Sequence, residues 1–169
     1  MAIKPIRLLG DPCLWKKCAA VKDVSAPEIA AVIRDLRDTL ADFKKKNGFG
    51  RGIAAPQIGV LKRIICIHFP KAKIDGAMIN PRIIKKSKAR IQLWDDCFSF
   101  PGLLVKVERA KEIAVAYLDE SGGKHTIIAD NGLSELLQHE IDHLDGILAT
   151  VRAIDGKSFA LRDGRKWGK

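Results

Sequence analysis

Two histidines four residues apart are the side chains in this sequence best suited to chemistry. They lie in residues 138–143, QHEIDH, which contain the pattern H-E-x-x-H. On a helix, positions i and i+4 share a face, so His139 and His143 could reach one metal ion. Glu140 would project beside them and could take a proton from a metal-bound water. The pattern alone leaves open the alternative of two histidines packed in a core.

A third ligand is needed, because a catalytic metal site of this kind has three protein ligands and one open position. The chain after His143 contains no His, Glu or Cys, and its aspartates are weaker candidates: Asp145, Asp155 and Asp163. We expect the third ligand upstream, at Cys97, because a thiolate is a strong ligand for Fe(II), Zn(II) or Co(II). Taken alone, Cys97 could be a buried thiol, which is the commoner fate of a free cysteine.

A glycine-rich segment, residues 50–57 (GRGIAAPQ), is the second candidate region. It lacks the lysine and hydroxyl residue of a P-loop, and it follows a predicted helix, so a phosphate cradle is not expected. Its glycines instead allow the backbone to approach a ligand closely. Gln57 could place an amide N–H at a developing oxyanion.

The first of two predicted helices starts at Ser25, which forms a capping box with Glu28, and has Pro27 in its first turn. Lysines 44–46 suit its negative end, and Asn47-Gly48 stop it. Apolar residues recur on one face at helical spacing. They are Ile29, Val32, Ile33, Leu36, Leu40 and Phe43.

Strands and a second helix complete the prediction. Five β-like runs lie at residues 60–67, 77–84, 103–108, 111–118 and 124–129, and residues 119–123 (DESGG) join the last two as a hairpin. The second helix begins at residue 130 or 131 and ends at residues 145–146, with its own apolar stripe of Leu133, Leu136, Leu137, Ile141 and Leu144. The expected fold is α+β. It is a single domain, 1–169, of mostly antiparallel strands around a central helix that carries H-E-x-x-H, with a second, N-terminal helix.

Composition sets the class of protein and its compartment. The 169 residues are 47% hydrophobic and 30% charged, a globular balance that excludes a disordered chain. No apolar stretch reaches the ~18–20 residues of a membrane span, and no apolar segment of a secretory signal begins the chain. We therefore expect a cytoplasmic protein whose four cysteines are thiols or ligands.

A formal charge of +10 would favour encounters with polyanions. The basic residues form small clusters, one of them in the terminal segment at 162–169. These clusters could contact ribosomal RNA or simply form a solvated surface. No nucleic-acid motif accompanies them, which favours the solvated surface.

Three segments together resemble the peptide deformylase family. Residues 50–57 match its first motif, G-apolar-G-L-A-A-P-Q, and residues 95–99 match its second, E-G-C-L-S, in part. Residues 138–146 match the third, Q-H-E-x-D-H-L-x-G, throughout, and the order and spacing also agree over about residues 5–150. The resemblance implies a hydrolase that removes the formyl group from the N-terminal formylmethionine of nascent peptides.

The resemblance also implies roles for individual residues. Cys97, His139 and His143 would hold the metal, Fe(II) in the cell, with Zn(II), Ni(II) or Co(II) as substitutes. Glu140 would act as general base and acid, while Gln57 and the backbone N–H of Phe98 would stabilise the oxyanion. The partners would be N-formylated nascent peptides and the ribosome surface, with no DNA and no membrane. Substrate would contact Gly50, Arg51, Gly52, Ile53, Asp96, Gly132 and Leu136.

Several positions depart from the family motifs. Arg51 replaces an apolar residue, Asp95-Asp96 replaces E-G, Phe98 replaces leucine, and Gly132 replaces a large apolar residue. We hypothesise that metal ligation survives while the pocket for the first side chain is altered, with Arg51 paired to Glu135 or Asp95. Two alternatives stay open: a hydrolase of other N-acyl groups, and a catalytically silent relative that binds peptide, ribosome or metal.

Overall fold

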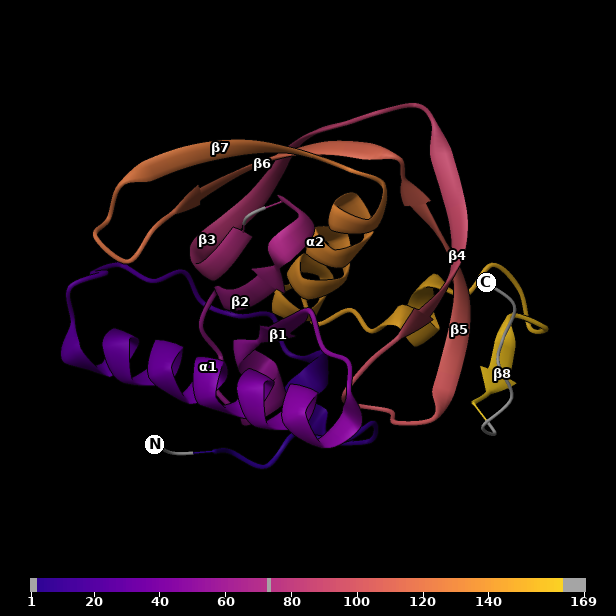
Figure 1. Ribbon diagram of the computed structural model, residues 1–169, viewed down its shortest axis with the longest axis horizontal. Helices are drawn as coiled ribbons and strands as arrows, with labels where there is room; N and C mark the ends of the chain where they lie inside the picture. The colour runs from indigo at the N-terminus through magenta and orange to yellow at the C-terminus, as the bar shows by residue number, and fades with distance from the viewer. Residues whose placement is uncertain (1–2, 73, 163–169) are drawn as a thin grey trace.

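Two antiparallel sheets and two helices make up the fold, in a computed structural model that describes residues 3–72 and 74–162 (Figure 1). The helices and strands are α1 (Pro27–Asn47), β1 (Gly52–Ala54), β2 (Ile64–Phe69), β3 (Ile74–Lys86), β4 (Arg90–Asp96), β5 (Leu103–Ala110), β6 (Glu112–Leu118), β7 (Lys124–Asp130), α2 (Asn131–Leu144) and β8 (Phe159–Leu161). The larger sheet has the order β1-β2-β3-β6-β7, and the smaller one has the order β4-β5-β8. The expected α+β class is confirmed.

The larger sheet is covered on both faces. Successive side chains of a strand point to opposite faces, so Ile65 and Ile67 of β2 pack with α2 while Ile64 and Cys66 pack with α1. This explains why the run is continuously apolar instead of alternating. Figure 1 shows α1 on the outside and α2 between the two sheets, and α2 contacts β1 and β7 of one sheet and β5 of the other. The helix that carries the two histidines is therefore central, as expected.

The capping box predicted for the start of α1, formed by Ser25 and Glu28, was wrong. Ala26 is the N-cap residue and Pro27 opens the helix, with no side-chain cap. Ser25 instead bonds to Asp23, whose Oδ1 accepts from both the backbone N–H (2.9 Å) and the hydroxyl (2.6 Å). Such local side-chain bonds compete with capping. The predicted stop is confirmed, because Gly48 adopts φ 77°, a left-handed conformation that glycine allows.

Three strands had no counterpart in the sequence prediction. β1 is three residues long and lies inside the glycine-rich segment, and β8 is equally short. β4 reads RIQLWDD, a run with charged ends that lies half-exposed against β5, so it lacks the apolar content of the other strands. Most of the basic C-terminal segment considered for contact with ribosomal RNA, residues 163–169, lies outside the described residues.

The thiols give a first testable prediction. Burial raises the pKa of Cys18 to about 11 and that of Cys66 to about 12, while Cys13 is half-buried. The thiolate is the reactive form, so at pH 8 a thiol-specific reagent should modify Cys13 within minutes and leave Cys18 and Cys66 unmodified. Peptide mass spectrometry would identify the sites, with denatured protein, in which all four cysteines react, as the control. Rapid labelling of Cys66 in folded protein would contradict this assignment.

Candidate metal centre and active site

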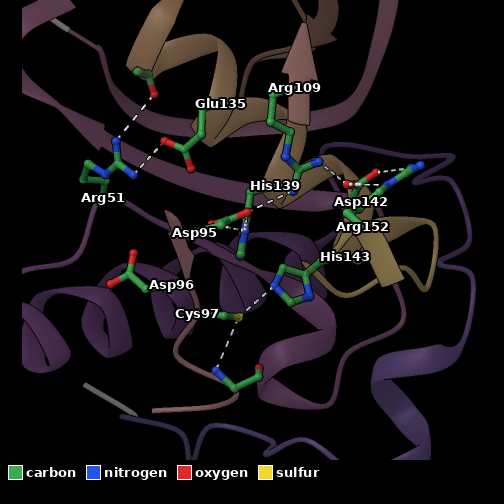
Figure 2. A network of polar contacts seen from close by, with 12 residues as sticks. Arg51, Asp95, Asp96, Cys97, Arg109, Glu135, His139, Asp142, His143 and Arg152 are labelled. Carbon is green, nitrogen blue, oxygen red and sulfur yellow. Dashed lines mark hydrogen bonds and ion pairs between the residues drawn. The ribbon is translucent and has the colours of Figure 1, made fainter. Parts of the chain in front are cut away.

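The three expected ligands lie together in the interior. His139 and His143 face inward from α2, and Cys97 follows the last residue of β4, where a turn begins with a bond from Phe100 N to Cys97 O (3.2 Å). Cys97, His139 and His143 each offer a ligand atom, and these atoms lie within 4.8 Å of one another; all three residues are buried. Cys97 Sγ is 3.3 Å from His143 Nε2, and the two side chains point toward each other in Figure 2.

This donor set fits a transition-metal ion. One sulfur and two imidazole nitrogens suit Fe(II), Zn(II) or Co(II). Bonds of about 2.0–2.3 Å from one ion to all three atoms are compatible with their separations. Burial and the neighbouring His139 hold the pKa of His143 well below its usual range, so its imidazole is neutral, the form that binds metals. The group can therefore hold a metal ion.

A buried chain of charges orients His139. Its Nδ1 lies 2.9 Å from Asp95 Oδ1, and Asp95 Oδ2 accepts from Arg109 Nη2 at 3.1 Å. Arg109 also pairs with Asp142, which binds Arg152 Nη2 at 2.8 Å near the surface (Figure 2). Because Nδ1 is engaged, Nε2 of His139 is left for a metal.

The same chain fixes the charge on Asp95. Burial opposes ionisation of Asp95, but His139 and Arg109 outweigh it and lower its pKa to about 2. Burial likewise lowers the pKa of His139, yet Asp95 and Cys97 bring it well above its usual range. Asp95 stands where the family motif has glutamate, so this shorter carboxylate still reaches His139.

Glu140 is the side chain placed to move protons. It is 3% exposed, its Oε2 has no hydrogen-bond partner among the described residues, and burial raises its pKa to about 7. A carboxyl group of that pKa can accept and return a proton near neutral pH. Its carboxylate lies against β1: a Cβ added to Gly52 would come within 2.6 Å of Glu140 Oε1.

Gly52→Ala should therefore displace the carboxylate of Glu140. We expect hydrolytic activity to fall about 100-fold, the cost of a displacement near 1 Å at a reacting group, with little change in thermal stability because only the end of a side chain must move. Steady-state kinetics and thermal melts would measure both effects. Gly76→Ala is the matched control, since a Cβ there meets nothing within 4 Å. Unchanged activity of Gly52→Ala would show that Glu140 does not need this position.

Gln57 and Phe98 flank the same site. Gln57 is buried, accepts from Ala54 N (2.9 Å) and donates through Nε2 to Ser99 Oγ (3.2 Å), with Cys97 Sγ 3.5 Å away. The backbone N–H of Phe98 donates no hydrogen bond within the described part of the chain. Its ring stacks on Phe43 of α1, with centroids 3.7 Å apart, which fixes this segment next to the ligands.

A cavity of about 420 Å³ opens onto these groups. It is lined by five of the seven predicted substrate-binding residues: Gly50, Arg51, Gly52, Asp96 and Leu136. Ile53 is not among the lining residues because its side chain packs on the α1 side of the sheet, and Gly132 lies next to Arg51 without lining the cavity. Trp94, three residues before Cys97, is also not among the residues described as lining this cavity and is 42% exposed.

Sequence reasoning missed several participants. His68 lines the cavity, and its backbone N–H donates to Arg51 O at 2.7 Å. Arg109 had no signal, because it is one of many charges in a strand pattern. Glu135 was expected only as a partner of Arg51, although its position four residues before His139 also indicated that it shares a helix face with that ligand. Arg51 pairs with Glu135 and not with Asp95, which settles the two expected pairings.

Comparisons with known proteins agree on one family. The family described as Polypeptide deformylase matches residues 3–158. Similar curated proteins include Peptide deformylase 2 of Clostridium acetobutylicum, 37% identical over 89% of this chain and 95% of that protein. Another is the peptide deformylase of Pseudothermotoga lettingae, 38% identical over 95% of this chain and 88% of that protein.

Solved structures are similar in the same way. The peptide deformylase of Thermotoga maritima has a TM-score of 0.83 and 28% identity, covering 92% of this chain and 100% of that one. The peptide deformylase of Ehrlichia chaffeensis, in complex with actinonin, has a TM-score of 0.84 and 32% identity, covering 94% of this chain and 92% of that one.

Proposed function

Because this chain belongs to the peptide deformylase family, we propose that it is a metal-dependent hydrolase that removes the formyl group from the N-terminal formylmethionine of nascent peptides. The observation that carries the proposal is the convergence of Cys97, His139 and His143 beside Glu140, whose buried Oε2 has no partner among the described residues. A site that only held a metal for structure would not need a buried carboxyl group at that place.

Cys97, His139 and His143 would hold the ion, which we take to be Fe(II) in the cell, with Zn(II), Ni(II) or Co(II) able to replace it. The one-sulfur, two-nitrogen donor set supports this choice of metals. When bound, the ion supplies a Lewis acid that lowers the pKa of a water molecule and polarises the formyl oxygen.

The protein's own groups would move the proton and the charge. Glu140 would accept a proton from the attacking water and pass it to the amine nitrogen as the amide C–N bond breaks, leaving formate and a peptide with a free N-terminus. The Phe98 N–H and the Gln57 amide would donate to the formyl oxygen as negative charge develops on it. The Phe98 N–H, which donates to no group in residues 3–72 and 74–162, supports this role.

The substrate backbone would bind at the edge of the larger sheet. β1 is the edge strand, so the backbone of Gly50, Arg51, Gly52 and Ile53 can pair with an extended peptide as an added strand. Leu136 and the Asp96 backbone would contact the residues nearest the reacting bond, and Gly132 would act through Arg51.

Formate release tests the proposal directly. Protein loaded anaerobically with Fe(II) should release formate from formyl-Met-Ala-Ser, and chelation should abolish release. Cys97→Ala should lose both metal and activity. Full activity of the chelated protein would contradict metal dependence, and activity only on acetylated or other acylated peptides would favour an N-acyl hydrolase. Tight metal binding without any hydrolysis would favour a silent relative.

We further propose that the protein works in the cytoplasm, where nascent chains emerge, and visits the ribosome through its basic surface without binding DNA or membrane. The charge of +10 supports contact with ribosomal RNA. The fraction of protein that cosediments with ribosomes should fall steeply as the salt concentration rises. Association that does not change with salt concentration would exclude an electrostatic contact. In the described ranges, 3–72 and 74–162, neither helix is long and apolar enough to cross a bilayer.

A further inference from the structure

An ion pair lies inside the active-site cavity, and one of its members, Arg51, stands where the first family motif has an apolar residue. Arg51 Nη2 is 2.8 Å from Glu135 Oε2, and both side chains line the cavity that reaches Cys97 and His139. The Glu135 side chain is 6% exposed and that of Arg51 is 43% exposed. Figure 2 shows the two side chains pointing toward each other, one from the segment before β1 and one from α2.

The absence of a side chain at Gly132 leaves space for the guanidinium of Arg51. A Cβ at this position would lie 3.8 Å from Arg51 Nη1 and 3.8 Å from Phe69 Cζ, so a larger side chain would occupy the place of the guanidinium. Gly132 O also lies 3.5 Å from Nη1. Positions 132 and 135 are three apart on one helix face, so Arg51, Gly132 and Glu135 form a matched set.

One carboxylate oxygen of Glu135, Oε1, is available to bind a ligand. Oε2 binds Arg51, whereas Oε1 accepts no hydrogen bond from the described residues and points away from Arg51 in Figure 2. An apolar side chain placed against this pair would remove water from it without replacing a hydrogen bond, which is unfavourable. The thioether of methionine would be such a side chain, because it carries no donor.

The chemistry of Oε1 favours a donor as its partner, because a carboxylate oxygen can only accept a hydrogen bond. The charges near Glu135 are of both signs: Asp95 and Glu140 are acidic, whereas Arg51 and His139 are basic. Arg162 lines the cavity too, but it is paired with Asp96 at 2.9 Å. A second cation at Oε1 would add a charge-assisted hydrogen bond to a largely buried carboxylate.

Resting on the proposed deformylase function, we propose that this cavity favours formylated peptides whose first side chain carries a cationic donor, of which the lysine ammonium is the simplest, bound by Oε1 of Glu135. The methylenes of that side chain would pack on Leu136, and formylmethionine peptides would be turned over more slowly. Arg51 and Glu135 are thus the specificity-determining pair, and Gly132 is the position that makes room for them.

The test compares formyl-X-Ala-Ser peptides with Fe(II)-loaded protein, where X is lysine, norleucine, methionine, glutamate or glycine. Norleucine has the length of the lysine stem without its ammonium group, so it isolates the contribution of the donor. We expect kcat/KM for lysine to exceed that for norleucine and methionine by about tenfold or more, the effect of one hydrogen bond to a charged group.

Variants separate the pair from the rest of the site. Glu135→Gln should reduce the lysine-to-norleucine ratio of kcat/KM about tenfold. The double variant Arg51→Leu/Glu135→Leu leaves no buried charge unpaired and should reverse the preference toward norleucine and methionine. Glu120→Gln, which changes an exposed carboxylate that pairs with Arg37 outside the cavity, is the matched control and should keep the wild-type ratio.

Each other outcome overturns the inference in a recognisable way. A kcat/KM for the methionine peptide equal to or above that for the lysine peptide would contradict the proposed specificity but not the deformylase function. Glutamate as the best substrate would mean that Arg51 and Lys44 select an acid, and glycine as the best would mean that Arg51 closes the pocket. No formate from any peptide would contradict the proposed function itself.

Discussion

Glu140→Gln is expected to lower kcat/KM for formate release by about 100-fold to 10,000-fold, the usual range for loss of a general acid–base group. The amide has the shape of the carboxyl group but cannot accept the proton of the attacking water. Because Oε2 of Glu140 has no partner among the described residues and is buried, replacing the carboxyl group removes no described hydrogen bond from that oxygen. The loss should therefore be one of activity and not of folding.

Three measurements on one preparation make this result specific. Formate release reports activity, metal analysis reports occupancy, and thermal melts report folding. Glu140→Gln should keep the metal content and the melting temperature of the unmodified protein, and Glu120→Gln should keep all three values. Loss of the metal together with activity would instead make Glu140 a ligand, and near-normal activity would remove it from the mechanism.

Arg109→Met should destabilise the protein by about 3–5 kcal/mol, the loss expected when one partner of a buried ion pair is removed. The Arg109 side chain is 4% exposed and lies between Asp95 and Asp142. Methionine fits the space but would leave Asp95 buried with only His139 beside it. Since Asp95 orients His139, metal affinity should also fall, by about 10–100-fold.

Urea denaturation and competition with a metal chelator measure these two effects separately. Arg37→Met is the matched control, because its partner Glu120 is 43% exposed and such surface pairs contribute under about 1 kcal/mol. Adding Asp95→Asn to Arg109→Met should recover part of the stability, since it removes the stranded charge. A stability loss equal to that of the control would show that the charge chain is not important for folding.

Local signals explain what the sequence predicted well. α2 has a stripe of leucines at helical spacing, and its two histidines share a face, so both the helix and the pair of imidazoles follow from spacing alone. The participation of Cys97 followed from the requirement for a third ligand and from the family motif. The continuous apolar run of β2 is typical of a strand covered on both faces.

Other parts depend on contacts between distant residues and could not be predicted. Arg109 precedes Asp142 by 33 positions, and nothing in its neighbours shows that it will be buried between two carboxylates. The three-residue strands β1 and β8 exist because longer neighbours provide their hydrogen-bond partners. The choice of Arg51 for Glu135 and not Asp95 depends on Arg109 and His139 already engaging Asp95.

The ligands come from separate packing units: Cys97 packs with Phe100 and Val105 under the smaller sheet, whereas Leu136 and Leu137 anchor the histidine helix in the main core. An ion bound by both units would cross-link them reversibly. Free energy of unfolding should then grow with the logarithm of free metal concentration. At low metal concentration the smaller sheet would be held less firmly to the helix. The protease resistance of this protein would then report the concentration of available metal around it.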